Sequence, residues 1–209
     1  MTAATNPRAA ATSILSRLLR GNEGYAAGRP ERPRRDRQPC RELCAGQSPV
    51  AVVIGCSDSR VSPEIVFDQG CGDLFVIRTA GHVLDGASLA SLEFGVVSLS
   101  IPLVVVLGHT GCGAVKAAVG GAGGGHHLPG LLRQITPAVP DTLADGEDPV
   151  HATVLRHLGR TVTHLRQADP TVAPRHARGE VTVVGMLQDL ATHRVSVMHG
   201  IPDDAPVSS

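Results

Sequence analysis

The chain has 209 residues, with 19 basic and 19 acidic side chains, so its formal net charge is zero. This length suits one domain. Neutral charge gives no electrostatic reason to expect a nucleic-acid partner, and an aromatic content of 2% nearly excludes base-stacking platforms. Five irregularly spaced cysteines are a poor disulfide framework and favour a reducing compartment.

No stretch of the chain predicts a membrane span or a secretory leader. The longest apolar run, residues 101–108, is far shorter than the ~20 residues that a transmembrane helix needs. The first residues lack the charged and apolar regions of a signal peptide. We therefore expect a cytoplasmic protein with neither a membrane nor a nucleic acid as its partner.

The first predicted element is an amphipathic helix, whose apolar side includes Ile14, Leu15 and Leu18. A Pro/Arg-rich arm at 28–41 follows it. Beyond the arm, unbroken aliphatic runs predict four buried strands, separated by segments with helical spacing. We expect strands at 50–55, 74–78, 103–107 and 181–185, an edge strand at 194–198, and helices at 87–99, at 113–119 and, divided by prolines, within 126–178.

Buried strands that alternate with helices predict an α/β fold, in which helices flank a central, mostly parallel β-sheet. We expect a single domain over 1–209, made of an N-terminal helix and arm (1–49), a metal-binding core (50–198) and a tail (199–209). In a parallel sheet, functional side chains gather at the carboxyl ends of the strands. Residues that follow the strands are therefore the first candidates for chemistry.

Two strand ends carry side chains that bind metals. Cys56 follows the first buried strand, and His109 and Cys112 follow the third. Parallel strands can lie side by side, so the three side chains can meet, and two cysteines with one histidine are a known catalytic zinc set with an open fourth position. Each residue also has an ordinary alternative, as a small core thiol or a hydrogen-bonded structural histidine. The residues by themselves therefore leave zinc binding open.

Two charged residues come shortly after the first of these cysteines. Asp58 and Arg60 occupy the second and fourth positions after Cys56, a spacing that lets their side chains project to one side of an extended turn. A carboxylate beside a cation stays ionised and can accept a hydrogen bond near a metal. The alternative is a surface ion pair of little consequence. Histidines at 126, 127, 151, 157, 164 and 176 show no regular ligand spacing and are expected on the solvated surface.

The motifs CSDSRV at 56–61 and GHTGCGAV at 108–115 together resemble the signature of the β-class carbonic anhydrases. The resemblance covers about residues 14–198. It implies a β-carbonic anhydrase-like fold and the reversible hydration of carbon dioxide to bicarbonate and a proton by a zinc-bound hydroxide. It also implies one Zn²⁺ per chain, whose ligands would be Cys56, His109 and Cys112.

The resemblance implies further roles around the metal. Asp58 and Arg60 match the family's catalytic pair, and Asp58 could be a fourth zinc ligand in a closed state. Gln69 is similar to the family's substrate-facing glutamine, and the main-chain amide near Gly113 would donate to bound bicarbonate. Family members build each active site at a subunit interface, so we expect a homodimer or homotetramer.

Two alternative functions remain open at this point. The same fold could hydrolyse a CO2 analogue such as carbon disulfide, or it could be a non-catalytic zinc-binding regulatory module. The intact pair of Asp58 and Arg60 argues against the module, because a structural zinc site has four closed ligands. His193 stands where the family has a turn glycine, a departure from its pattern, because a histidine can occupy a left-handed turn only at more cost than glycine. His82 is a candidate proton shuttle. The cysteines without an assigned role are Cys40, Cys44 and Cys71.

Overall fold

The computed structural model describes residues 6–31, 33, 41–121 and 124–200. Cys40, most of the Pro/Arg-rich arm and positions 201–209 of the expected tail lie outside the described residues. The strands of its sheet are β1 (Ala51–Cys56), β2 (Leu74–Thr79), β3 (Leu103–His109), β4 (Thr182–Gln188) and β5 (Val195–His199). Their spatial order is β2-β1-β3-β4-β5; the first four are parallel, and β5 is antiparallel to β4.

The burial of the sheet explains its sequence pattern. Every residue of β1, β3 and β4 is buried, as expected for unbroken aliphatic strands covered on both faces. β2 lies at one edge of the sheet and is largely half-buried, whereas β5 lies at the other edge and is more exposed. The predicted α/β fold with a mostly parallel sheet is therefore confirmed.

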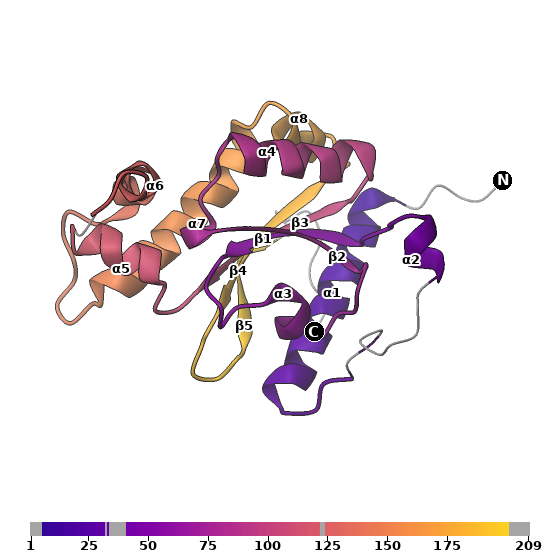
Figure 1. The fold of residues 1–209 in the computed structure, drawn as a ribbon, viewed down its shortest axis with the longest axis horizontal. Helices are drawn as coiled ribbons and strands as arrows, with labels where there is room; N and C mark the ends of the chain where they lie inside the picture. Colours follow the sequence, from indigo (N-terminus) through magenta and orange to yellow (C-terminus); the bar gives the residue numbers. More distant parts are fainter. Residues whose placement is uncertain (1–5, 32, 34–40, 122–123, 201–209) are drawn as a thin grey trace.

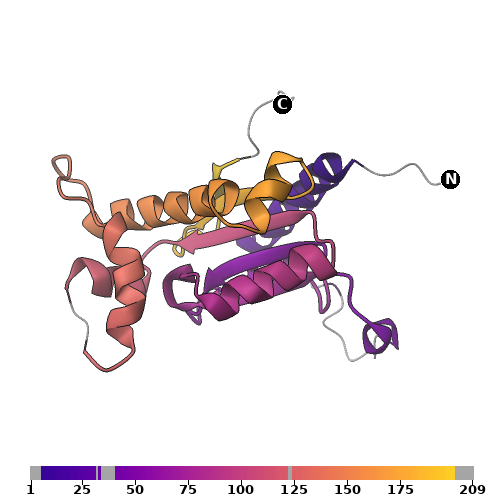
Figure 2. The same ribbon diagram turned by 90° about the horizontal axis from the view of Figure 1, so that it is seen from above.

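Helices cover both faces of the sheet. Alternate strand residues point to opposite faces, so Val52 and Val104 pack in one apolar cluster and Val53 and Val105 in another. The helices are α1 (Pro7–Ala26), α2 (Arg41–Ala45), α3 (Pro63–Val66), α4 (Gly86–Glu93), α5 (Gly113–Val119), α6 (Leu128–Ile135), α7 (Pro149–Gln167) and α8 (Val172–Ala177). Figure 1 shows α4 and α8 above the sheet and α1 and α3 below it. Seen from above, α4, α7 and α8 lie in front of the strands (Figure 2). None of the described helices is long and apolar enough to cross a membrane.

Some helices differ in detail from the expectation. The helix expected at 87–99 is α4 followed by a π-helical turn, in which the Leu99 amide donates to the Phe94 carbonyl five residues earlier (3.2 Å). The short helix α3 was not expected, because four residues show no helical period, although Pro63 in its first turn is a known start signal. The segment 126–178 contains α6, α7 and α8, and Pro149 begins α7.

Asn22 joins α1 to two distant parts of the chain. Its Nδ2 donates to the carbonyl oxygens of Val66 (3.0 Å) and His193 (2.9 Å), and its Oδ1 accepts from the Val195 amide (2.8 Å). One buried side chain therefore connects α1, α3 and the turn between β4 and β5. His193 has a φ of 61°, so a histidine does occupy the left-handed conformation in that turn.

Candidate metal centre

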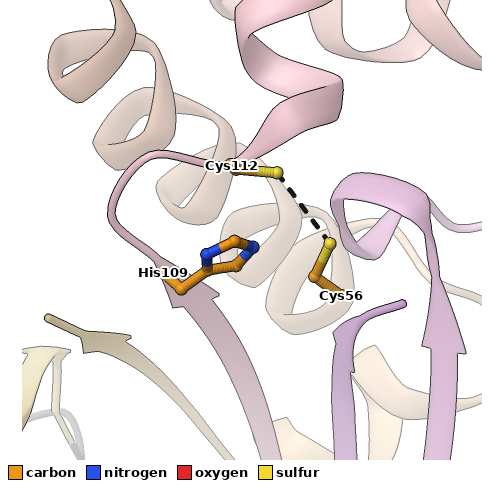
Figure 3. A group of neighbouring side chains, drawn as sticks. All are labelled: Cys56, His109 and Cys112. Atoms are coloured by element: carbon orange, nitrogen blue, oxygen red, sulfur yellow. Dashed lines mark hydrogen bonds between the residues drawn. The ribbon is translucent and has the colours of Figure 1, made fainter. Parts of the chain in front are cut away.

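The carboxyl ends of β1 and β3 bring three metal-binding side chains together. Cys56 is the last residue of β1, His109 is the last residue of β3, and Cys112 immediately precedes α5. These strands are parallel neighbours, so their ends meet at one edge of the sheet. The three donor atoms lie within 4.8 Å of one another, and all three residues are buried (Figure 3). Gly111, with a φ of 65°, turns the chain between the last two donors in a conformation that favours glycine.

The geometry of these donors fits zinc. The sulfur atoms of Cys56 and Cys112 are 3.9 Å apart. Two zinc–sulfur bonds of ~2.3 Å at a tetrahedral angle would place them about 3.8 Å apart. Nδ1 of His109 lies 3.0 Å from the Thr110 carbonyl oxygen, so Nδ1 carries the proton and Nε2 keeps its lone pair. That Nε2 is buried without a hydrogen-bond partner in the described part of the chain, and a metal ion would satisfy it.

Hydrogen bonds prepare Cys56 to bind a cation as a thiolate. The Cys112 thiol and the backbone amides of Asp58 (3.4 Å) and Gly81 (3.2 Å) donate to its sulfur. These contacts, the Cys112 thiol above all, together with the neighbouring His109 side chain outweigh burial and lower the pKa of Cys56 to about 4. The pKa of Cys112 is raised, because its thiol is bound to the Cys56 sulfur and is buried. The pair thus shares one proton, and binding a divalent cation would release it.

Asp58 and Arg60 form the pair that the sequence predicts. Arg60 donates through Nε to Oδ1 of Asp58 (2.9 Å) and through Nη2 to Oδ2 (2.6 Å). The Arg60 amide also donates to Oδ1 (3.0 Å), and together these bonds hold the pKa of Asp58 well below its usual range. Oδ2 lies 4.0 Å from Nε2 of His109. An ionised acceptor therefore stands beside the three donors.

Arg78 contributes to the site and was missed by the sequence interpretation, which predicts it only as the end of a strand. Its Nε donates to the Cys56 carbonyl oxygen (2.8 Å), and its Nη2 donates to the Asp58 carbonyl oxygen (2.6 Å). Arg78 therefore holds the turn that carries both side chains. The sequence feature that could have indicated this role is a cation near the carboxyl end of β2. This strand pairs with β1, and Gly55 lies opposite Arg78.

The two residues expected to bind substrate lie in different places. Gly113 is the first residue of α5, directly after Cys112, and a Cβ added there would meet nothing within 4 Å. Gln69 is buried, and its Nε2 donates to the Phe67 carbonyl oxygen (2.6 Å). It lines a cavity of about 340 Å³ beside α1, whose described lining residues include none of the three donors. Within one chain, Gly113 therefore adjoins the centre and Gln69 lies against α1.

Two histidines near the centre, His82 and His157, are buried. The expectation that His157 lies on the solvated surface is wrong, since it is 5% exposed. It shares the buried face of α7 with Val154, Leu158 and Thr161, at the helical spacing that could have indicated its burial. His82, the candidate proton shuttle, is 2% exposed and does not contact bulk water directly as a shuttle would. Burial lowers the pKa of both histidines.

Several known proteins are similar to this chain in both sequence and fold. A family model described as carbonic anhydrase matches residues 51–195. The chain is 44% identical to carbonic anhydrase 2 of Mycobacterium tuberculosis over 191 residues, which cover 89% of this chain and 90% of the relative. It is 40% identical to a carbonic anhydrase of Mycolicibacterium smegmatis over 190 residues, with 89% and 92% covered. Among solved structures, the Coccomyxa β-carbonic anhydrase in complex with acetazolamide matches with a TM-score of 0.68 and 27% identity, covering 88% of this chain and 86% of that one.

The parallel sheet and the Cys2His group at its carboxyl edge define a zinc-dependent α/β enzyme. Together with the matches over most of its length, they show that the chain belongs to the β-class carbonic anhydrase family. Members of this family are lyases that hydrate carbon dioxide, so the expected reaction class and the expected zinc cofactor are confirmed.

Proposed function

We propose that this protein catalyses the reversible hydration of carbon dioxide to bicarbonate and a proton at one zinc ion held by Cys56, His109 and Cys112. The observation that carries the proposal is a buried Cys2His group beside an ionised Asp58 that Arg60 holds in place. Three protein ligands leave a fourth position for water. Bound zinc would lower the pKa of that water to about 7, the value known for a carbonic anhydrase with a different ligand set, and so supply a nucleophile near neutral pH.

In the hydration direction, a water oxygen bonds to the carbon of CO2, one C–O double bond opens, and a proton leaves. Asp58 would accept a hydrogen bond from the attacking water through Oδ2, the oxygen 4.0 Å from His109 Nε2. This bond would point an oxygen lone pair at the carbon. Arg60 would keep the carboxylate ionised and oriented. Two thiolates add negative charge to the centre, so hydration should be faster on the alkaline side of neutral.

An open fourth position agrees better with these contacts than ligation by Asp58. Both carboxylate oxygens accept charge-assisted hydrogen bonds from Arg60, and a zinc ion bound to either oxygen would compete with Arg60 for it. The hydration rate measured from about pH 6.5 to 9 tests this point. A gradual decline toward acid supports the open site, whereas an abrupt loss below about pH 8 supports Asp58 as a fourth ligand.

Substrate contacts are proposed for two residues. The backbone amide near Gly113 would donate to a bicarbonate oxygen, because this residue directly follows the ligand Cys112 and has open space at its Cα. Gln69 would reach substrate across a subunit boundary, since within its own chain it lines a cavity beside α1. The proposal for Gln69 therefore depends on oligomerisation.

A homodimer or homotetramer is proposed from the apolar side chains on the surface. Phe94 and Val97, in the π-helical turn after α4, are 47% and 44% exposed. Val197 and Met198 are 39% and 41% exposed on β5, an edge strand whose free side can pair with another chain. A cytoplasmic location is proposed because two thiolate ligands require a reducing compartment.

Neither alternative function is favoured. The relatives that match nearly the whole chain are carbonic anhydrases, which argues against a hydrolase of a CO2 analogue. A regulatory zinc module would hold its metal with four protein ligands, whereas the metal-binding group among the described residues has three.

Zinc content and stopped-flow CO2 hydration test the proposal together. The purified wild type should contain about one zinc per chain and hydrate CO2. Cys56→Ser should lose both zinc and activity, whereas Cys71→Ser, which changes an exposed free cysteine, should retain both. A wild type that is active without metal, or a Cys56→Ser protein with full zinc and activity, would refute the proposed function.

A further inference from the structure

Gly81 connects helix α7 to the metal centre through its backbone. It lies in a 3-10 turn, Ala80–His82, directly after β2. Its amide donates to the sulfur of Cys56 (3.2 Å), and its carbonyl oxygen accepts from Nε2 of His157 (2.8 Å). The N–H and the C=O belong to two peptide groups that rotate about one Cα. Holding the carbonyl therefore restricts the direction in which the amide points.

The backbone at this turn needs such support. Gly81 has a φ of 65° and His82 has a φ of 47°, so two consecutive residues adopt the left-handed conformation. Left-handed residues normally occur singly, and this conformation costs a histidine more free energy than it costs a glycine. A Cβ on Gly81 would lie 2.8 Å from Cδ1 of Ile135 and 3.2 Å from Cβ of Ala114, so the turn is also tightly packed. An unusual conformation of this kind persists because its surroundings hold it.

His157 is well suited to hold the turn. A carbonyl oxygen accepts, so Nε2 of His157 carries a proton, and burial keeps the ring neutral by lowering its pKa. The ring stacks on that of His82, with centroids 4.4 Å apart and planes inclined by 29°. Stacking restricts rotation of the His157 ring and so keeps Nε2 directed at Gly81.

We propose that His157 is a positioning residue of the metal centre: its hydrogen bond to the Gly81 carbonyl aims the Gly81 amide at the Cys56 thiolate. The inference rests on the proposed zinc ligation by Cys56. An N–H bond to a thiolate stabilises the charge on sulfur and fixes the direction of its lone pairs. Loss of a group that is hydrogen-bonded directly to a metal ligand weakens metal binding by about 10- to 100-fold. His157 acts on such a group, the Gly81 amide, so its loss should cost an amount near the lower end of this range.

Three variants separate the hydrogen bond from the bulk of the ring. His157→Phe keeps an aromatic ring that can stack on His82 but lacks the donor, and His157→Gln keeps a donor but lacks the ring. Thr161→Val is the matched control, because it removes a buried hydroxyl one turn along α7 that donates to the His157 backbone oxygen (3.0 Å). Zinc dissociation constants are measured by competition with a chromophoric chelator, and the absorption spectrum is recorded after substitution with cobalt(II).

We expect His157→Phe to raise the zinc dissociation constant by about 10-fold, the lower end of the range for losing a group bonded directly to a ligand. Its thiolate-to-cobalt band should shift to longer wavelength, because the Gly81 amide is no longer aimed at the sulfur and stabilises its lone pair less. His157→Gln should stay within about threefold of the wild type in affinity, since the donor remains. Thr161→Val should match the wild type in both measurements. The shifted band is a readout that a general loss of packing would not produce.

Wild-type affinity and an unshifted band in folded His157→Phe would overturn the inference while leaving the proposed function intact. Failure of the wild type to bind zinc would instead refute the proposed function. If His157→Phe does not fold, hydrogen exchange of the Gly81 amide in the zinc-loaded wild type decides. Strong protection supports the inference, and exchange as fast as that of an exposed amide overturns it.

Discussion

Replacing Asp58 with asparagine tests the proposed mechanism with a minimal change in shape. Oδ1 of Asp58 accepts from two Arg60 donors, the side-chain Nε (2.9 Å) and the amide (3.0 Å), whereas Oδ2 accepts from Nη2 (2.6 Å). In Asp58→Asn, the amide oxygen should keep the Oδ1 position and the NH2 group should take the Oδ2 position. A donor would then face another donor on Arg60. It would also stand 4.0 Å from His109 Nε2, where the reaction needs an acceptor.

The size of the effect follows from the bonds that are lost. One hydrogen bond to a charged group contributes about 1.5–3 kcal/mol, and each ~1.36 kcal/mol in the barrier changes the rate about tenfold. Losing one such bond to the attacking water therefore lowers kcat/KM by about 10- to 150-fold. The new NH2 group and Arg60 Nη2 also repel each other, so we expect the loss in kcat/KM to lie near the upper end of this range, at about 100-fold. Zinc content should not change, because Asp58 is not one of the three donors.

Stopped-flow CO2 hydration on zinc-loaded protein measures this loss, with zinc content determined on the same samples. Asp141→Asn is the matched control, because it makes the same chemical change at an exposed position. It should leave kcat/KM unchanged. The reasoning would be refuted by a zinc-loaded Asp58→Asn protein whose kcat/KM lies within about twofold of the wild type.

Asn22→Ala removes three hydrogen bonds that join α1, α3 and the last turn, so the free energy of unfolding in urea should fall by about 3 kcal/mol. Arg78→Met removes two bonds to the carbonyl oxygens of Cys56 and Asp58, so kcat/KM for CO2 hydration should fall about tenfold. Burial keeps His82 and His157 neutral in the folded protein, so below their ordinary pKa of 6.5 the unfolded chain binds more protons than the folded one. The free energy of unfolding should therefore decrease as the pH falls from about 6.5 to 5, by up to ~1.4 kcal/mol per pH unit for each histidine.

Each of these experiments has a matched comparison. Ser16→Ala on the exposed side of α1 should leave the free energy of unfolding nearly unchanged, and an equal loss in both variants would contradict the role given to Asn22. Arg133→Met, at an exposed position, should retain full activity. An Arg78→Met protein as active as this control would show that the turn needs no support. The pH slope should be shallower in zinc-saturated His157→Gln, and an unchanged slope would contradict the assignment of a buried neutral His157.

Much of the fold was predictable because it depends on local pattern. Unbroken aliphatic runs indicate strands that are buried on both faces, and β1, β3 and β4 are such strands. The same pattern predicts a parallel sheet, in which functional side chains gather at the carboxyl ends of the strands. This is why the side chains of Cys56 and His109, 53 positions apart, could be expected to lie together. Asp58 and Arg60 were predictable because their contact spans two residues.

The sequence by itself therefore determined the strands and placed the three candidate donors and the charged pair at one sheet edge, since each of these rests on short-range spacing or on the general geometry of a parallel sheet. Zinc ligation by the three donors came from the resemblance to the family. The tertiary structure alone decided that Arg78 holds the turn after β1 and that the Gly81 backbone links His157 to Cys56. It also decided that His157 is buried, although its residue type suggested the surface. These contacts depend on strand register and on how α7 rotates against the sheet, and both are settled by packing across distant segments of the chain.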